Sequence, residues 1–221
     1  MKTNFSAILA ISFFLLSCSR SEDPIEETTE ATPFFNLNVG NEWVYKTYDR
    51  PDFNSDFKFN GQIDTLKIIS EETSNNKKYY KITHSNRNQF SNYIEYWRVN
   101  KNGYLVYLSS IDFDKGNTLD TNEAVKHPGK DYSLIYPDNN YIEYGSLIYK
   151  LYPETTLTID NQNYKVYPFK GQFTPNDQNP NLIPKVVERN YSEGIGLVKH
   201  VSHSVSGTYN FEDRLVSYKI N

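Results

Sequence analysis

The chain has 221 residues, a formal net charge of −4, 19 tyrosines, 13 phenylalanines and a single cysteine. One cysteine excludes an intramolecular disulfide, and its position near the amino terminus leaves the rest of the chain without zinc–thiolate sites or cysteine nucleophiles. The acidic balance also lacks the basic excess of a nucleic-acid-binding protein, so we expect no nucleic-acid partner.

Residues 1–17 have the pattern of a secretory signal peptide. Lys2 precedes an apolar run over residues 7–16 that is too short to span a bilayer. The run ends in LLSC, which resembles the lipobox of bacterial lipoproteins. In those proteins the cysteine becomes the mature amino terminus and carries acyl chains, so we expect Cys18 to be lipidated and to anchor the chain in a membrane. An ordinary signal peptide cleaved near Cys18 is the alternative.

Residues 18–33 predict a disordered tether, because their composition cannot bury enough apolar surface to fold. An acidic patch just after a lipidated cysteine also resembles the export signal of Bacteroidota lipoproteins. The resemblance implies the outer face of the outer membrane; the periplasmic face, with the segment as a plain spacer, is the alternative. The acids of this segment are Glu22, Asp23, Glu26, Glu27 and Glu30.

Residues 34–221 predict a single all-β domain. Tyrosine, phenylalanine, isoleucine, valine and threonine favour half-buried strands. In YIEYWRV, for example, Glu95 and Trp97 share one face while Tyr96 and Arg98 share the other. Runs of this kind recur at short spacing, so we expect an antiparallel meander of about ten or eleven strands, curled into a partial barrel or a sandwich.

Turns and loops are predicted between these runs. Asn102-Gly103 is a strong signal for a two-residue hairpin turn. Residues 112–131 and 174–184 are predicted to be loops, the first with at most one helical turn. Further turns are expected near Asp160–Gln162, Ser192–Gly194 and Glu212-Asp213.

The stretches NVGNEWVYKTY, DTLKI, YSEGIGLVKH and DRLVSYKI resemble a group of uncharacterised Bacteroidota outer-membrane lipoproteins. The shared pattern is VGN-x-W-x-Y near the start, then Gly-x-Gly-Leu-Val and a final L-x-SYK strand. The resemblance implies a β-rich domain at the cell envelope and implies no catalytic residue. Within these motifs we expect Trp43 to anchor the core, and Gly194 and Gly196 to allow a bend or a close backbone approach.

One acidic stretch, DFDKGNTLDTNE at 112–123, is a candidate calcium loop. Asp112, Asp114, Asp120 and Glu123 fall at ligand positions of a twelve-residue loop. The expected acid-then-glycine order at the centre of the loop is reversed, however, and no flanking helices are predicted. A solvated acidic loop is therefore the favoured interpretation, and no metal or cofactor is assigned.

The histidines show no metal-binding pattern. His200 and His203 are three apart on a predicted strand, which places them on opposite faces. His84 and His127 have no partner that the sequence suggests.

No motif of a hydrolase, a zinc protease or a nucleotide-binding loop is present, so we expect a protein that is not an enzyme. The favoured function is an envelope lipoprotein that binds a partner protein or a glycan through its sheet. Tyrosine side chains suit contact with sugars, but their alternation along the strands favours a mixed role in core and surface. The alternative is a carrier or sensor of an apolar or lipid ligand in a half-barrel cavity. An enzyme whose groups converge only in space is a third hypothesis.

Overall fold

The computed structural model describes residues 33–86, 93–100, 104–116, 123–126, 133–136, 144–204 and 207–221. These residues belong to one compact unit, Ala31–Asn221. Cys18 and nearly all of the tether lie outside the described residues. The elements are β1 (Glu42–Arg50), β2 (Lys58–Ser74), β3 (Lys77–His84), β4 (Tyr93–Val99), β5 (Tyr104–Ser109), α1 (Ser110–Asp114), β6 (Glu123–Lys126), β7 (Ser133–Tyr136), β8 (Gly145–Leu151), β9 (Thr155–Ile159), β10 (Gln162–Pro175), β11 (Lys185–Ser192), β12 (Gly196–His203) and β13 (Asn210–Lys219).

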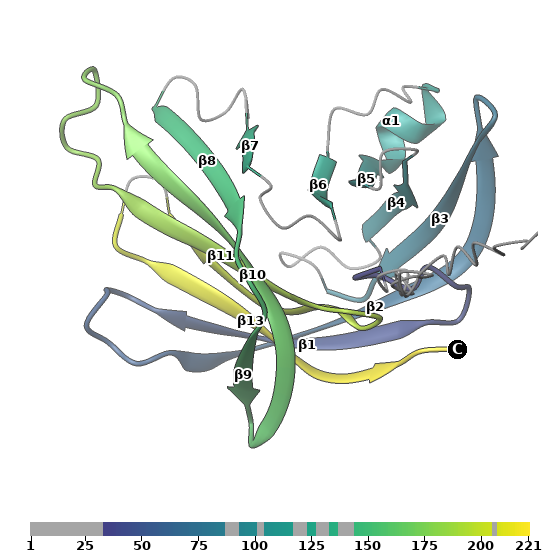
Figure 1. The fold of residues 1–221 in the computed structure, drawn as a ribbon, viewed down its shortest axis with the longest axis horizontal. Helices are drawn as coiled ribbons and strands as arrows, with labels where there is room; N and C mark the ends of the chain where they lie inside the picture. The colour runs from purple at the N-terminus through teal and green to yellow at the C-terminus, as the bar shows by residue number, and fades with distance from the viewer. Residues whose placement is uncertain are drawn as a thin grey trace, which may run out of the picture. The chain divides into compact units, whose positions relative to one another are not determined.

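The strands form one 13-stranded sheet, and every described pair is antiparallel. Their order is β6-β5-β4-β3-β2-β1-β13-β12-β11-β10-β8-β7, with β9 paired to β10. The predicted all-β class is confirmed. The described strands belong to a single curled sheet and not to a two-sheet sandwich, and Figure 1 shows β3–β5 and β8, β10 and β11 rising on either side of β1, β2 and β13.

The first and last strands pair with each other at the middle of this sheet. β1 and β13 run in register from Glu42 opposite Lys219 to Arg50 opposite Asn210, with one irregularity at Val44/Tyr45. A second irregularity interrupts the pairing of β1 with β2. Irregularities of this kind bend a strand and increase its twist, which suits a sheet that must curl around an inner face.

Two-residue turns close two of the hairpins. Asp160 and Asn161 both have positive φ, 46° and 67°, between Ile159 and Gln162, which pair across the turn. This is the backbone of a type I′ turn and confirms the turn predicted there. Asn75-Asn76 makes the same kind of turn between β2 and β3, with φ of 48° and 59°. The turn expected at Asn102-Gly103 lies outside the described residues, although β4 and β5 on either side of it do pair.

Two predictions differ from the structure. Glu212 and Asp213 lie in the middle of β13, so the turn expected there is wrong. Glu123–Lys126 forms β6 and pairs with β5, so the loop expected over 112–131 is wrong in that part. The loop expected over 174–184 is confirmed from residue 176 onward.

The hydrophobic core covers the inner face of the sheet. Trp43, Ile82, Phe169 and Leu215 are among the side chains fully or almost fully removed from solvent. A smaller cluster lies on the opposite face of β3–β5, where the Phe113 ring of α1 stacks on Tyr96 with centroids 3.7 Å apart. No helix among the described residues has the length and apolar character needed to cross a membrane.

Candidate ligand-binding site

A pocket of about 540 Å³ opens on the inner face of the sheet. Its lining comes from β1–β5 and β11–β13, together with Phe35 from the segment before β1 and Tyr209 just before β13. These strands are consecutive in the order β5-β4-β3-β2-β1-β13-β12-β11, so the pocket is at the middle of the sheet.

Seven polar side chains of the lining form a row across the inner face, one from each of seven neighbouring strands. Cross-strand register places His200 opposite both Arg189 and Asp213. Asp213 in turn stands opposite Thr47. In the strand order β4-β3-β2-β1-β13-β12-β11, the members of this polar row are Glu95, His84, Asp64, Thr47, Asp213, His200 and Arg189.

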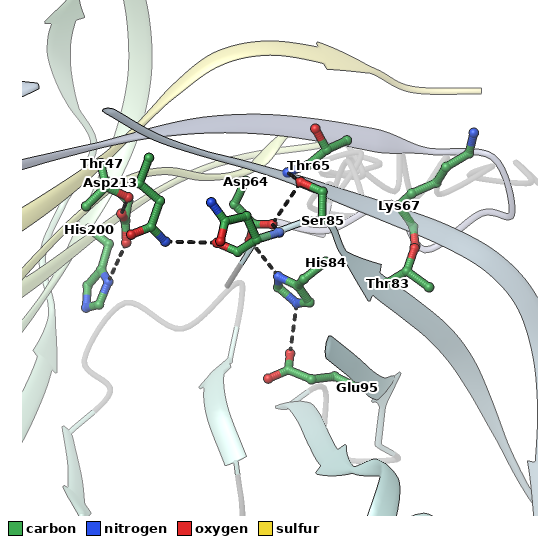
Figure 2. Close-up of polar contacts among 12 residues, drawn as sticks. Thr47, Asp64, Thr65, Lys67, Thr83, His84, Ser85, Glu95, His200 and Asp213 are labelled. Carbon is green, nitrogen blue, oxygen red and sulfur yellow. Dashed lines mark hydrogen bonds and ion pairs between the residues drawn. The ribbon is translucent and has the colours of Figure 1, made fainter. Parts of the chain in front are cut away.

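The half of the polar row on β2–β4 is buried. His84 has a carboxylate at each ring nitrogen: Asp64 Oδ2 lies 2.7 Å from Nδ1 and Glu95 Oε2 lies 3.5 Å from Nε2. The Trp97 indole N–H donates to the same Glu95 oxygen at 2.9 Å, and the Asn86 backbone N–H donates to Asp64 at 2.9 Å. The side chains of His84, Glu95 and Asp64 are only 3%, 9% and 12% exposed, and Figure 2 shows them in sequence along the row.

The half on β1, β13 and β12 is open to solvent. The Thr47 hydroxyl donates to Asp213 Oδ1 at 2.7 Å, and His200 Nδ1 lies 3.6 Å from Asp213 Oδ2 (Figure 2). The side chains of His200 and Asp213 are 23% and 35% exposed. A ligand in the pocket can therefore contact this half directly, while the buried half shapes the field around it.

Two buried tyrosines lie among the charges of the row. Burial raises the pKa of Tyr45 well above its usual value, and the negative charges of Asp213 and Asp64 add to this. The Tyr45 hydroxyl donates to the Leu197 carbonyl at 2.7 Å. Burial also raises the pKa of Tyr191, an effect that the nearby Arg189 opposes. Both phenols therefore stay neutral over the physiological pH range.

Aromatic rings border the polar row on both sides. On the apolar side the Phe35 ring packs edge-on against Trp97 and Tyr191, with centroid distances of 5.2 and 5.9 Å. On the solvent side Tyr209 and Phe211 line the mouth of the pocket, 6.1 Å apart, and each is more than a third exposed. The pocket thus combines flat apolar surfaces with hydrogen-bonding groups.

The motif residues predicted from sequence lie beside the pocket. Trp43 is fully buried, and its indole N–H donates to the Ile195 carbonyl. Gly194 and Gly196 have φ of +72° and +101°, which L side chains rarely adopt. A Cβ at Gly196 would lie only 2.4 Å from the nearest carbon of the Phe35 ring, so the glycine permits the close approach that puts Phe35 into the pocket wall.

Only two of the four calcium candidates, Asp112 and Asp114, have side chains within the described residues. Asp112 is in the first turn of α1, where the Ser109 hydroxyl donates to its carboxylate at 2.7 Å, and Asp114 ends the helix. Asp120 and the side chain of Glu123 lie outside the described residues. Within the part of the chain that the structure describes, no three His, Asp or Glu side chains are grouped as a metal site.

No member of the polar row was predicted from sequence as a site residue. A signal for them exists: Asp64, His84 and Glu95 occupy positions whose neighbours two residues away, such as Leu66, Ile82 and Trp97, are buried. A polar residue at an inward position of an alternating strand is unusual and indicates a site. Which of these residues meet depends on strand order, which the pattern of one strand does not contain.

No protein-family model and no curated protein matches the chain. Two crystal structures of other proteins are similar in part. One is a candidate exported protein with a YmcC-like fold from Bacteroides fragilis, with 11% identity, a TM-score of 0.46, and coverage of 86% of this chain and 100% of that one. The other is a candidate lipoprotein from Parabacteroides distasonis, with 11% identity, a TM-score of 0.39 and the same coverage. Similarities of this size do not bear on the function of this chain.

Proposed function

We propose that the chain is a lipid-anchored protein of the bacterial outer membrane whose folded unit binds a glycan, without catalysis, in the pocket of the inner face. The observation that carries this proposal is the polar row between two sets of aromatic rings in a pocket of about 540 Å³. Carboxylates, imidazoles and hydroxyls bind sugar hydroxyls, and aromatic rings stack on the apolar faces of sugar rings. The volume is also within the range of small-ligand sites.

Other occupants fit this pocket less well. A protein partner typically covers about 800 Å² of each surface and needs a broad contact area, not a pocket. An acyl chain would suit Leu66, Trp97 and Leu105 on the apolar side. It would also remove the partly exposed Asp213 carboxylate from solvent without offering it a hydrogen bond, which is unfavourable.

The anchor is assigned to Cys18 and the outer membrane location to the acidic segment that follows it. Acyl chains contribute about 0.8 kcal/mol per buried CH₂, so a multiply acylated Cys18 would hold the chain on the membrane. We expect the wild-type chain in the outer-membrane fraction, with an acylated amino terminus by mass spectrometry and sensitivity to protease on intact cells. Cys18→Ser should move the protein to the soluble fraction; retention of that variant in the membrane would contradict the assignment.

Glycan binding is tested with the mature chain carrying Cys18→Ser, first on a glycan array and then by calorimetry with the best sugar. Phe211→Ala removes an exposed ring at the pocket mouth and should weaken binding roughly two- to tenfold, the worth of one aromatic contact. Phe53→Ala is the matched control, because Phe53 is similarly exposed but does not line the pocket. Mass spectrometry of the recovered sugar should show it unchanged.

Either of two results would refute this function. Failure to bind any sugar on the array removes the glycan proposal, and co-purification of an acyl lipid would replace it with the lipid-carrier alternative. Cleavage or modification of the sugar, abolished by a substitution in the polar row, would show an enzyme.

A further inference from the structure

We infer that the glycan bound in this pocket carries a free amine, and that the pocket discriminates against sugars bearing carboxylate or phosphate groups. The inference rests on the glycan-binding function proposed above and names the class of sugar. The described lining residues include three carboxylates but one guanidinium, that of Arg189. The other titratable groups of the lining are imidazoles and phenols. The carboxylates are Asp64, Glu95 and Asp213.

The exposed carboxylate of the row is the one that an amine can reach. Asp213 is about one-third exposed, whereas Asp64 and Glu95 are largely buried. The Thr47 hydroxyl donates to Asp213 Oδ1, and Oδ2 lies 3.6 Å from His200 Nδ1, so an ammonium group bound to Asp213 would share Oδ2 with His200. An ammonium group there would form a charge-assisted hydrogen bond, which is stronger than a bond between neutral groups.

The negative charges of Asp64 and Asp213, on the two strands that flank β1, act on the same region of the pocket, around Tyr45. Tyr45 stands directly opposite Asp64 in the pairing of β1 with β2, and Asp213 lies on the strand paired to the other side of β1. The negative charges of Asp213 and Asp64 both contribute to the raised pKa of the Tyr45 phenol, after the larger effect of its burial. A positive group at the same place is favoured by the same two charges.

The aromatic rim places a sugar ring within reach of Asp213. Phe211 and Asp213 are two residues apart on β13, so their side chains leave the same face about 7 Å apart. Tyr209, which lines the pocket just before β13 begins, donates its hydroxyl to Asp49 Oδ2 at 2.6 Å. A hexosamine stacked on Phe211 can therefore direct its amine toward Asp213.

The test compares three oligosaccharide series of equal length by calorimetry at neutral pH: glucosamine, N-acetylglucosamine and galacturonic acid oligomers. These carry amines, neutral amides and carboxylates. The mature Cys18→Ser chain should bind the glucosamine series about tenfold more tightly than the neutral series and the acidic series more weakly than either. Raising the ionic strength from about 0.05 M to about 0.5 M should reduce this preference, because salt screens charges that face solvent.

Asp213→Asn should bring the affinities for the amine and neutral series to within about twofold of each other, since the amide keeps an acceptor for Thr47 but loses the charge. Asp177→Asn is the matched control; it removes the same charge from the exposed loop between β10 and β11, away from the pocket. The Asp177→Asn variant should prefer the glucosamine series over the neutral series by the same factor as the parent chain.

The outcomes separate this inference from the glycan proposal. Equal affinity for amine and neutral sugars, or tighter binding of the acidic series, overturns the inference and leaves glycan binding intact. Binding of none of the three series, together with an empty glycan array, overturns both. Binding of a trilysine peptide but not of glucosamine oligomers also overturns both, and assigns the pocket to a basic peptide.

Discussion

Replacing Gly196 with alanine should destabilise the folded unit by about 2–6 kcal/mol, from two separate costs. The first is conformational: φ at this position is +101°, and an L side chain there costs about 1–3 kcal/mol. The second is steric, because the new Cβ would lie less than 3.0 Å from two carbons of the Phe35 ring. Overpacking of this kind typically costs about 1–3 kcal/mol, and the contacts of Phe35 with Trp43, Trp97 and Tyr191 restrict its escape.

Gly61 supplies a matched control for the first cost. Its φ is +91°, close to that of Gly196, but a Cβ built there has no atom within 4 Å. Gly61→Ala should therefore cost only the conformational part, about 1–3 kcal/mol. In a Phe35→Ala background, Gly196→Ala should also fall to that smaller cost, because the ring that it strikes is gone.

Urea unfolding of the mature Cys18→Ser chain, followed by tryptophan fluorescence, measures all of these free energies. Equal costs for Gly196→Ala and Gly61→Ala would refute the reasoning, since the Phe35 ring would then not rest on Gly196. The pocket would in that case lose one of its aromatic walls. The experiment therefore tests the site as well as the core.

Two further predictions concern the buried part of the site. Trp97→Phe keeps most of the apolar area but removes the N–H that donates to Glu95. The free energy of unfolding, measured in urea, should therefore fall by about 1–3 kcal/mol. An unchanged free energy would show that this hydrogen bond is not formed. Burial raises the pKa of Tyr45 and of Tyr191 in the folded chain, so the unfolded chain loses these protons first and stability should fall as pH rises above 10, the ordinary tyrosine value. The ultraviolet titration of the native chain should show these two phenols ionising last, and Tyr191→Phe should flatten the alkaline part of the stability curve; a curve as steep as that of the parent chain would contradict this.

The fold was largely predictable because alternation and turn chemistry are local properties. Asp160-Asn161 is an example: two residues that tolerate positive φ between two alternating runs indicate a two-residue turn, and the structure has one. The error at Glu212-Asp213 is also instructive. Two adjacent acids suggest a turn, but in β13 they point to opposite faces, Glu212 toward Lys199 at 2.8 Å and Asp213 toward Thr47. Those partners come from other strands, so the sequence of the segment does not reveal them.

The site was much less predictable, because its parts are distant in sequence. Thr47 and Asp213 are 166 positions apart and meet only because the first and last strands pair. His84 and His200 have no sequence neighbours that indicate a site; each acquires a carboxylate from the next strand of the sheet. The alternation of apolar and polar residues along a strand predicts which face of the sheet a side chain occupies. The order and register of the strands determine which other side chains it contacts on that face.

The polar row is hard to explain by stability alone. The inner face of a curled sheet is where the core forms, and buried ionisable groups there are often less favourable than apolar side chains of similar size. Glu95 and Asp64 nevertheless occupy inward positions beside Trp97 and Leu66. Glu95 accepts a hydrogen bond from the Trp97 indole and pairs with His84, and Asp64 pairs with His84 and accepts from the Asn86 backbone N–H. Departures from the pattern that would best stabilise a fold are expected at functional sites. The same side chains line the pocket, where a bound ligand would contact them.

If apolar replacement of His84 together with its two carboxylate partners raises stability while glycan binding is lost, the polar row serves binding at the expense of the stability of the fold. If the replacement lowers stability and binding survives, the row is structural and the site must be sought elsewhere.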